Sequence, residues 1–245
     1  MSYCLLIPHY NHHHQLIRFL PKLINTGLAC VIVDDGSSEE SIQLLQNALA
    51  NHPTTHLFLQ RRNRGKGGAV KAGFYHARSL GFTHAIQIDA DGQHNLDDLP
   101  EFIRFSQENP QAIICGKPVF DKSVPKARLY GRKVTDFWVA LETLSFKIKD
   151  GLCGFRIYPL TETEKILDHY FLSSRMDFDT EFLVKAVWLK IQLIFVKTNV
   201  IYPENNISHF NYLRDNLQLI KLHARLILGM LIRFPMLLWH RIQGL

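Results

Sequence analysis

The stretch IQIDADGQH, residues 86–94, joins a buried-strand pattern to a sudden pair of acidic side chains. Ile86 and Ile88 are typical of a strand covered on both faces, and Asp89 and Asp91 follow directly. In an extended segment these two carboxylates point the same way and repel each other unless a cation lies between them. We therefore expect a strand that ends in a site for Mg²⁺ or Mn²⁺, which prefer oxygen ligands.

Similar short apolar runs recur along the first half of the chain, at residues 3–8, 30–35, 56–60, 84–89 and 112–116. Roughly 15 to 25 residues separate them, enough for the crossover helices that parallel strands require. Ser37 or Ser38 can cap a helix that begins at Glu39, and a second helix is expected to end at Gly81. This alternation predicts an α/β fold with a mostly parallel sheet flanked by helices.

The composition suits a globular protein with an anionic partner. The chain has 245 residues, 47% of them hydrophobic, and a formal net charge of +6, which favours nucleic acid, a phosphorylated ligand or a membrane surface. The basic residues are spread over short loops and a tail instead of alternating with stacking aromatics, so no nucleic-acid partner is expected. The four cysteines lack the close pairs of a zinc site and are predicted to be reduced core residues.

Two further loops carry polar groups that suit a phosphorylated ligand. Asp34 and Asp35 precede Gly36, which fits either a simple Asp-Gly turn or carboxylates that accept from a ribose hydroxyl or a base. RRNRGKGGAVKAG, residues 61–73, sets basic residues among glycines at the start of a helix, where backbone N–H groups favour phosphate. It lacks the spacing and the Lys-Ser/Thr ending of a Walker A loop. A plain basic loop fits Arg61 and Arg62, and phosphate proximity is predicted for Arg64, Gly65 and Lys66.

The last thirty residues form a basic apolar tail. Residues 216–245 contain no acidic side chain, and Arg225 and Arg233 interrupt their apolar residues too often for a membrane span. Either a helix docked on the protein or a helix in a membrane interface fits this pattern. We therefore expect one domain over residues 1–215, followed by a helical amphipathic tail.

Six motifs occur together in a characteristic order: LIPHYN, VIVDDGSSEES, NRGKGGAVKAGF, IQIDADGQHNLDDLPEFI, DGLCGFRIY and RMDFDTEFLVKA. In order and spacing the chain resembles the family 2 glycosyltransferases of GT-A fold, most of all the dolichol-phosphate mannose synthase-like branch. The resemblance covers residues 3–215. It implies an enzyme that moves a sugar, with inversion, from a GDP- or UDP-linked donor to an acceptor, with Mg²⁺ or Mn²⁺ as the cofactor.

The resemblance also implies roles for individual residues. A metal role is implied for Asp89, Asp91 and Gln93. Nucleotide-sugar binding is implied for Pro8, Tyr10, Asn11, Asp34, Asp35, Arg64, Gly65, Lys66, Asp89 and Ala90. Acceptor binding is implied for Asp150, Gly154, Ser208, His209 and Arg214, although the last stretch lacks the Ser-Lys pair of the synthases. A catalytic role is implied for Asp91, Arg156, Asp179 and Glu181.

The acceptor decides whether a general base is needed. A sugar or lipid hydroxyl needs a carboxylate to take its proton, and RMDFDTE offers Asp179 and Glu181, with Asp177 as a helix cap. A phosphate is already anionic, since its second pKa is about 6. We expect a polyprenyl phosphate at the cytoplasmic face of a membrane, which the tail would help to reach. Transfer to a hydroxyl is the alternative within enzymes, and a non-catalytic nucleotide-binding module is the alternative outside them.

Overall fold

The structure is a computed structural model that describes residues 1–120, 126–199 and 212–242. Its first half alternates strands and helices: β1 (Tyr3–His9), α1 (His13–Ile24), β2 (Ala29–Asp34), α2 (Glu39–Leu49), β3 (Thr55–Leu59), α3 (Lys66–Ser79), β4 (His84–Gln87), the short 3₁₀ helix η1 (Leu96–Asp98), α4 (Leu99–Glu108) and β5 (Ile113–Val119). The second half contains α5 (Lys126–Thr143), β6 (Arg156–Pro159), α6 (Leu160–His169), α7 (Phe178–Trp188), β7 (Leu193–Asn199) and α8 (Tyr212–Ile242).

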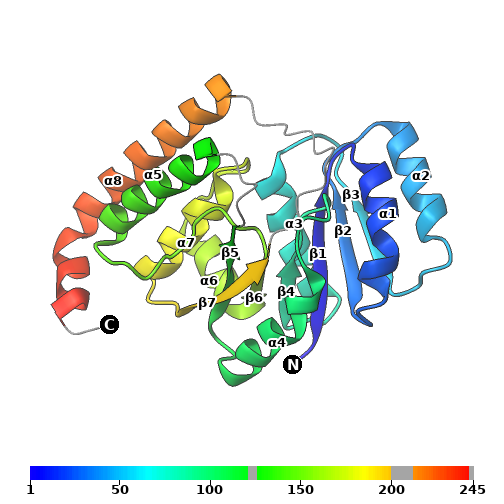
Figure 1. Ribbon diagram of the computed structural model, residues 1–245, viewed down its shortest axis with the longest axis horizontal. Coiled ribbons are helices and arrows are strands. Elements are labelled where there is room, and N and C mark those ends of the chain that lie inside the picture. The colour runs from blue at the N-terminus through cyan, green and yellow to red at the C-terminus, as the bar shows by residue number, and fades with distance from the viewer. Residues whose placement is uncertain (121–125, 200–211, 243–245) are drawn as a thin grey trace.

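The strands form one sheet in the order β3-β2-β1-β4-β6-β5-β7 (Figure 1). Its neighbours pair in parallel except β6, which runs antiparallel to β4 and β5. The predicted α/β fold with a mostly parallel sheet flanked by helices is confirmed. The antiparallel β6 brings its amino end, with the preceding loop 150–155, to the edge where β1, β2 and β4 end.

Helices cover both faces of the sheet, which explains the continuous apolar runs of the strands. In β1, Leu5 and Ile7 belong to the core cluster under α1, α2 and α4. Cys4 and Leu6 face the opposite cluster, to which α3, α5, α6, α7 and α8 contribute. The four cysteines are buried and free, as predicted.

The helix starts follow local rules. Ser38 caps α2, because its hydroxyl accepts a hydrogen bond from the Ser41 amide at 3.3 Å. Gly65 is the N-cap of α3 and has a φ of +88°, a conformation that favours glycine. A side chain there would also meet the Ser174 carbonyl, since a Cβ on Gly65 would lie 2.5 Å from that oxygen. The glycine-rich loop is thus shaped by its fit against residues 173–175.

The tail helix α8 docks along α5 and α7 and leaves its other side exposed. Its buried residues are Leu222, His223, Leu226, Met230 and Leu237. Gly229 lies against the Trp188 ring, and the Arg233 guanidinium lies 4.7 Å from the centre of the same ring. By length and composition alone, Leu217–Trp239 could cross a membrane, which differs from the prediction that Arg225 and Arg233 interrupt the apolar residues too often for a span. Of the two expected arrangements, the structure has the helix docked on the protein. The domain boundary after residue 215 stays a prediction.

Candidate active site

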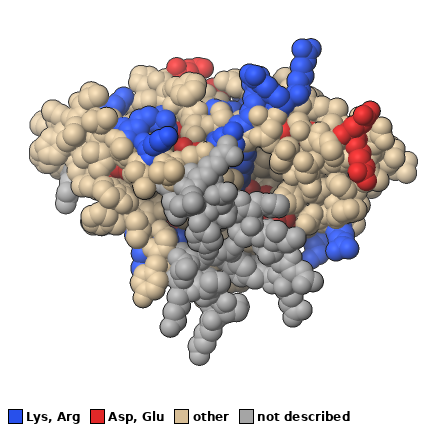
Figure 2. All heavy atoms as spheres, turned by 90° about the horizontal axis from the view of Figure 1, so that it is seen from above, with Lys and Arg blue, Asp and Glu red and all other residues tan. Residues whose placement is uncertain are grey.

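Polar side chains from β1, β2, β4 and the loop before β6 meet at the carboxyl edge of the parallel strands, where ligands of open α/β sheets bind. Figure 2 views this edge, where Lys and Arg side chains gather. Asp89 follows β4, Asp34 ends β2, and Lys66 opens α3. The structure thus brings together the donor-side residues that the sequence predicted.

A lysine between two carboxylates lies at the centre of the site. The Lys66 Nζ atom lies 2.8 Å from Asp89 Oδ1 and 2.9 Å from Asp179 Oδ2. Burial would lower the pKa of Lys66, but the negative charges of Asp179 and Asp89 outweigh it and raise that pKa. Burial would likewise raise the pKa of Asp89, but Lys66 and the His94 ring hold it well below its usual range. Lys66 and Asp89 therefore both stay charged near neutral pH.

Gly154 makes room for this ion pair. A Cβ atom on Gly154 would lie 2.7 Å from Asp89 Oδ2 and 2.9 Å from Lys66 Nζ. Any larger residue would push these two side chains aside. Gly154 was predicted on the acceptor side, whereas the structure places it against Asp89, a predicted metal ligand, so its acceptor contact stays a prediction.

Arg156 is fully buried and holds two main-chain segments of the site in place. Its guanidinium donates to the Asp179 carbonyl at 2.8 Å and to the Gly151 carbonyl at 3.0 Å. Burial opposes its charge, but Tyr158 and Asp179 help to keep its pKa raised. Gln87 donates to Asp179 Oδ1 at 3.2 Å, which fixes the carboxylate that pairs with Lys66. Arg156 therefore holds the start of α7 and the 150–155 loop together.

The acidic pair at the end of β2, Asp34 and Asp35, organises the loops of the site. Asp34 accepts from the His9 ring at 2.8 Å and from the Gly36 and Ser37 amides at 3.1 and 2.9 Å. Burial acts against its charge, but these partners lower the pKa of Asp34. Asp35 accepts from the Arg64 and Gly65 amides at 2.8 and 2.7 Å, while burial keeps its pKa raised. Contacts of either carboxylate with a nucleotide stay a prediction.

The residues at the end of β1 and in the loop that follows it lie at the same edge. Pro8 pairs with Val33 in the sheet, and Tyr10 is exposed. Asn11 has a φ of +53° and accepts from the Ser38 amide at 2.9 Å, which ties this loop to the start of α2. The predicted nucleotide residues therefore border one surface.

The predicted metal residues form a partial set of ligands. Asp91 is exposed, and its Oδ1 accepts from the Gln93 amide at 3.0 Å. The residue is exposed as a whole, but neighbouring atoms partly bury its carboxyl group, and this burial and the charge of Asp89 raise the pKa of Asp91. Among the described residues Asp91 makes no ion pair. His94 is buried beside Asp89, with its Nε2 3.4 Å from Asp89 Oδ2, and neither ring nitrogen makes a hydrogen bond. Across the ranges described, no cluster of three metal-ligating side chains occurs.

A divalent cation fits this chemistry. An unpaired carboxylate with a raised pKa and a buried imidazole without hydrogen bonds both lie next to Asp89, and Ala90 between the carboxylates is buried. His94 was missed in the sequence, although it lies within the acidic stretch itself. The available signal was a histidine three residues after Asp91, because an imidazole so close to two carboxylates is a further candidate metal ligand.

Glu181 lies away from the Lys66 pair. Its carboxylate is fully buried and accepts from the Ser173 amide at 2.7 Å, from Lys185 Nζ at 2.6 Å and from Arg225 Nη2 at 2.9 Å. The structure therefore does not bring Glu181 together with Asp179, and a catalytic role for Glu181 stays a prediction. Asp177 is the N-cap residue of α7, but its side chain makes no capping hydrogen bond and accepts from the Ser173 hydroxyl at 2.5 Å.

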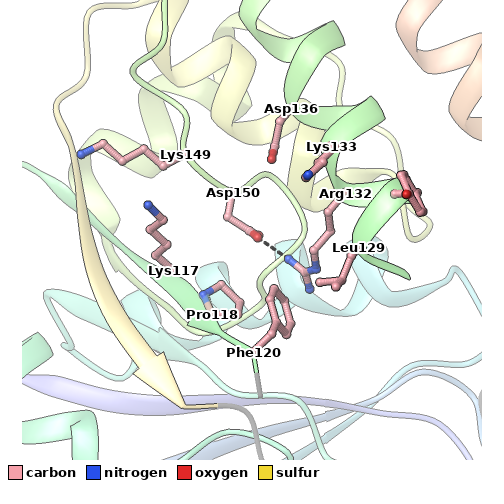
Figure 3. Close-up of a pocket in the computed structure, with 10 residues that line it drawn as sticks. Lys117, Pro118, Phe120, Leu129, Arg132, Lys133, Asp136, Lys149 and Asp150 are labelled. Carbon is pink, nitrogen blue, oxygen red and sulfur yellow. Dashed lines mark hydrogen bonds and ion pairs between the residues drawn. The ribbon is translucent and has the colours of Figure 1, made fainter. Parts of the chain in front are cut away.

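A cavity of about 490 Å³ lies beside the 150–155 loop (Figure 3). Its lining residues are Lys117, Pro118, Phe120, Leu129, Tyr130, Arg132, Lys133, Asp136, Lys149 and Asp150. Asp150 is one of the predicted acceptor residues, and it holds the loop by accepting from the Leu152 and Cys153 amides at 3.0 and 2.7 Å. Its other oxygen pairs with Arg132, whose guanidinium lies over the Phe120 ring. The cavity thus combines four basic side chains with an apolar wall.

The sequence prediction missed most of this cavity. Leu129, Arg132, Lys133 and Asp136 recur at helical spacing along α5 and so share one side of the helix. That pattern was the available signal. Burial and the charge of Asp150 raise the pKa of Asp136 to about 6. Ser208 and His209 lie outside the described residues, and Arg214 belongs to the first turn of α8.

Three known proteins are similar to this chain in sequence or in fold. A dolichyl-phosphate beta-glucosyltransferase of Dictyostelium discoideum is 28% identical over 215 residues, which cover 79% of this chain and 64% of the relative. A UDP-N-acetylglucosamine–dolichyl-phosphate N-acetylglucosaminyltransferase of Methanococcus voltae is 24% identical, with 83% and 87% covered. The mannosyltransferase PcManGT of Pyrobaculum calidifontis, solved with GDP-Man and Mn²⁺, has the same fold, with a TM-score of 0.59 at 15% identity over 84% of this chain and 58% of its own.

The chain spans just under two thirds of the length of the Dictyostelium relative. The model of one family, described as Glycosyl transferase family 2, matches residues 4–167. This match includes β1, the Asp34–Asp35 loop, the start of α3, the Asp89–Asp91 stretch and the loop before β6. It extends over well more than half of the chain and confirms the resemblance, so the protein belongs to glycosyl transferase family 2.

Proposed function

We propose that the protein transfers a sugar from a GDP- or UDP-linked donor to a polyprenyl phosphate at a membrane surface, with Mg²⁺ or Mn²⁺ and with inversion. The observation that carries the proposal is the basic, partly apolar cavity at Asp150, which belongs to the same loop as Gly154, the glycine that lies against Lys66 and Asp89. The Dictyostelium and Methanococcus relatives, whose names specify dolichyl phosphate, support the same acceptor.

The donor would bind across the carboxyl edge of the sheet. Arg64, Gly65 and Lys66 start α3, where N–H groups and positive charge favour a diphosphate. Asp34 and Asp35 keep the two flanking loops in place through backbone amides. In this proposal Lys66 stays charged beside the leaving diphosphate, held by Asp89 and Asp179.

A divalent cation would be held by Asp89 and Asp91, with Gln93 and His94 close by. When bound, the cation neutralises the negative charge that develops on the nucleoside diphosphate as it leaves. Within the chain, Gly154 keeps space open beside Asp89, and Arg156 fixes the main chain at Asp179. These residues position the charges and do not exchange protons.

The acceptor would place its phosphate among Lys117, Arg132, Lys133 and Lys149. Arginine and lysine suit phosphate oxygens, and the Phe120 and Leu129 side chains suit the first apolar units of a prenyl chain. A phosphate oxygen already carries charge and attacks without a base. This agrees with the site, because Asp179 is paired with Lys66 and Glu181 is buried.

The exposed sides of α5 and α8 would rest on the membrane. Large apolar side chains are exposed on both helices, which pack side by side (Figure 1): Tyr130, Val134, Phe137 and Leu141 on α5, and Leu217, Ile220, Leu228, Leu231, Ile232 and Trp239 on α8. Apolar rows flanked by basic residues are typical of interfacial helices. Tyr130 both lines the cavity and is exposed, so a lipid could enter beside it. We place the protein at the cytoplasmic face of a membrane, as a peripheral protein.

One incubation tests the proposal. The purified chain is mixed with Mn²⁺, a panel of GDP- and UDP-sugars, and polyprenyl phosphate, and products are identified by mass. A glycosyl polyprenyl phosphate, lost with EDTA and with Asp91→Ala, is the expected product. Nucleotide binding without any transfer would support the non-catalytic module and overturn the proposal, and turnover that EDTA leaves unchanged would overturn the metal requirement.

Transfer to a hydroxyl is the second candidate, because one carboxylate of the cavity is suited to act as the general base that takes the proton of the hydroxyl. Asp136 lines the cavity and has a pKa raised to about 6, close to the operating range of a general base. A sugar or lipid alcohol added in place of the phosphate would then be glycosylated, and Asp136→Asn would abolish that reaction.

A further inference from the structure

The buried carboxylate of Glu181 joins three separate parts of the chain. It accepts from the Ser173 amide in the segment before α7, from Lys185 one turn further along α7, and from Arg225 on α8. The Glu181 side chain has no exposed surface, whereas that of Arg225 is 52% exposed. A buried carboxylate needs such donors, so each contributes to holding the others in place.

Residues 171–175 form a strap between this network and α3. On the α7 side, Lys185 Nζ donates to the Phe171 carbonyl at 2.7 Å in addition to its bond with Glu181. On the α3 side, Lys71 Nζ donates to the Leu172 carbonyl at 2.8 Å and to the Ser174 hydroxyl at 3.0 Å. The strap is thus anchored on both sides by buried or partly buried lysines.

The strap reaches the first turn of α3, next to the loop proposed for the diphosphate. The Gly68 amide donates to the Ser174 carbonyl at 2.9 Å. Cβ atoms on Gly65 and Gly67 would lie 2.5 Å from the Ser174 carbonyl and 3.0 Å from the Ser173 carbonyl. Three glycines in four positions therefore fit the strap against the helix, and a shift of the strap would be transmitted to Arg64, Gly65 and Lys66.

We propose that Glu181 is a positioning residue that couples the tail helix to the donor-binding loop, through Arg225 on one side and the 171–175 strap on the other. The part of this inference that concerns donor affinity rests on the proposed function. Nucleotide affinity then depends on Arg225, which lies on α8 and is remote in sequence from every donor residue. Glu181 itself has no exposed oxygen with which to reach an acceptor hydroxyl.

The test compares Arg225→Met with Lys221→Met, which removes the same charge from an exposed position on α8 that has no part in this network. Amide hydrogen exchange is followed by mass spectrometry on peptides covering residues 171–175 and 65–70. Affinity for UDP and GDP with Mn²⁺ is measured by calorimetry, which requires no transfer.

Arg225→Met is expected to speed exchange in both peptides and to weaken nucleotide affinity by about threefold to fivefold, a modest factor because Arg225 is half exposed. In Arg225→Met the KM for the sugar nucleotide should rise while kcat is kept. Arg225→Lys should restore part of each effect. Wild-type exchange at 65–70, or an equal effect of Lys221→Met, would overturn the coupling. If the wild-type chain binds neither nucleotide, the proposed function fails, while the exchange data still decide the coupling.

Discussion

Replacing Asp136 by asparagine should strengthen phosphate binding in the cavity at neutral pH. Asp136 faces the same space as Lys117, Arg132 and Lys133. Among the described residues its carboxylate makes no ion pair, whereas Asp150 pairs with Arg132. A phosphate that enters brings about −1.5 to −2 charges at pH 7. When phosphate binds to the wild-type protein, either the phosphate and the Asp136 carboxylate repel each other or Asp136 takes up a proton. The Asn variant avoids both costs because its side chain is neutral.

The pKa of Asp136 sets the size of the effect. Burial first, and the charge of Asp150 second, raise this pKa to about 6. Protonating Asp136 at pH 7.5 therefore costs about 1.5 pKa units, or about 2 kcal/mol, which is a ceiling for the gain. The side chain is only partly buried, so water screens the charge, and we expect about 1 kcal/mol, or about fivefold in Kd.

The sign of the pH dependence follows from the raised pKa. Wild-type Asp136 is mostly protonated at pH 5 and mostly charged at pH 7.5. The two proteins should therefore bind alike at pH 5 and differ by about fivefold at pH 7.5. Comparing both proteins at the same pH cancels the titration of the ligand's own phosphate.

The assay is calorimetric titration of both proteins with farnesyl phosphate at the two pH values. Asp97→Asn, which removes an exposed carboxylate outside the cavity, is the matched control and should change nothing. Equal affinities at pH 7.5, or weaker binding by Asp136→Asn, would show that the phosphate binds elsewhere. Loss of turnover with a hydroxyl acceptor would instead identify Asp136 as a base.

Three further predictions concern packing, the tail and the membrane. Gly154→Ala should lower kcat/KM by about tenfold or more and stability by about 1–3 kcal/mol, measured by turnover and urea unfolding, because the new methyl group displaces the ion pair of the site. His223→Ala should destabilise the protein by about 3 kcal/mol in the same unfolding assay, because the buried Glu142 carboxylate, 2.7 Å from the His223 ring, loses its partner. Phe137→Glu should reduce co-sedimentation with anionic lipid vesicles, since its ring is 64% exposed on α5.

Controls separate these effects from general damage. Gly131→Ala adds a methyl group where nothing lies within 4 Å, so it should keep both stability and turnover. Tyr75→Glu adds the same charge at an exposed aromatic on α3, so vesicle binding should remain. Glu142→Gln should cost less than His223→Ala, because it leaves no unpaired charge. Equal losses in a variant and its control would contradict the reasoning for that variant.

The parts of the fold that depend on local sequence were predictable. Apolar runs gave β1, β2, β3, β4 and β5 to within a few residues, and Ser38 and Gly81 marked helix ends as expected. The antiparallel direction of β6 was not predictable, because it depends on pairing with β4 and β5, far away in sequence. Only that pairing brings Gly154 against Asp89.

The site divides in the same way. Asp89 follows β4, Asp34 ends β2 and Lys66 opens α3, so general rules about strand ends and helix starts were enough to select them. The cavity required contact between α5 and the 150–155 loop, which no local pattern specifies. For the tail, too, the sequence did not predict which residues make contact. Arg225 and Arg233 were interpreted only as interruptions of a membrane span, and the structure shows that both contact side chains of α7.

The spacing of two in RMDFDTE has opposite meanings in a strand and in a helix. The resemblance implied a role in one site for both Asp179 and Glu181, which would require them to point to the same side, as residues two apart do in an extended segment. The segment is helical from Phe178, where each residue turns the chain by about 100°, so the two carboxylates point about 200° apart. Asp179 therefore meets Lys66 in the site, and Glu181 meets Arg225 on α8. Asp179 and Glu181 thus face opposite sides of the first turn of α7, one toward the Lys66 ion pair and the other toward the tail helix α8.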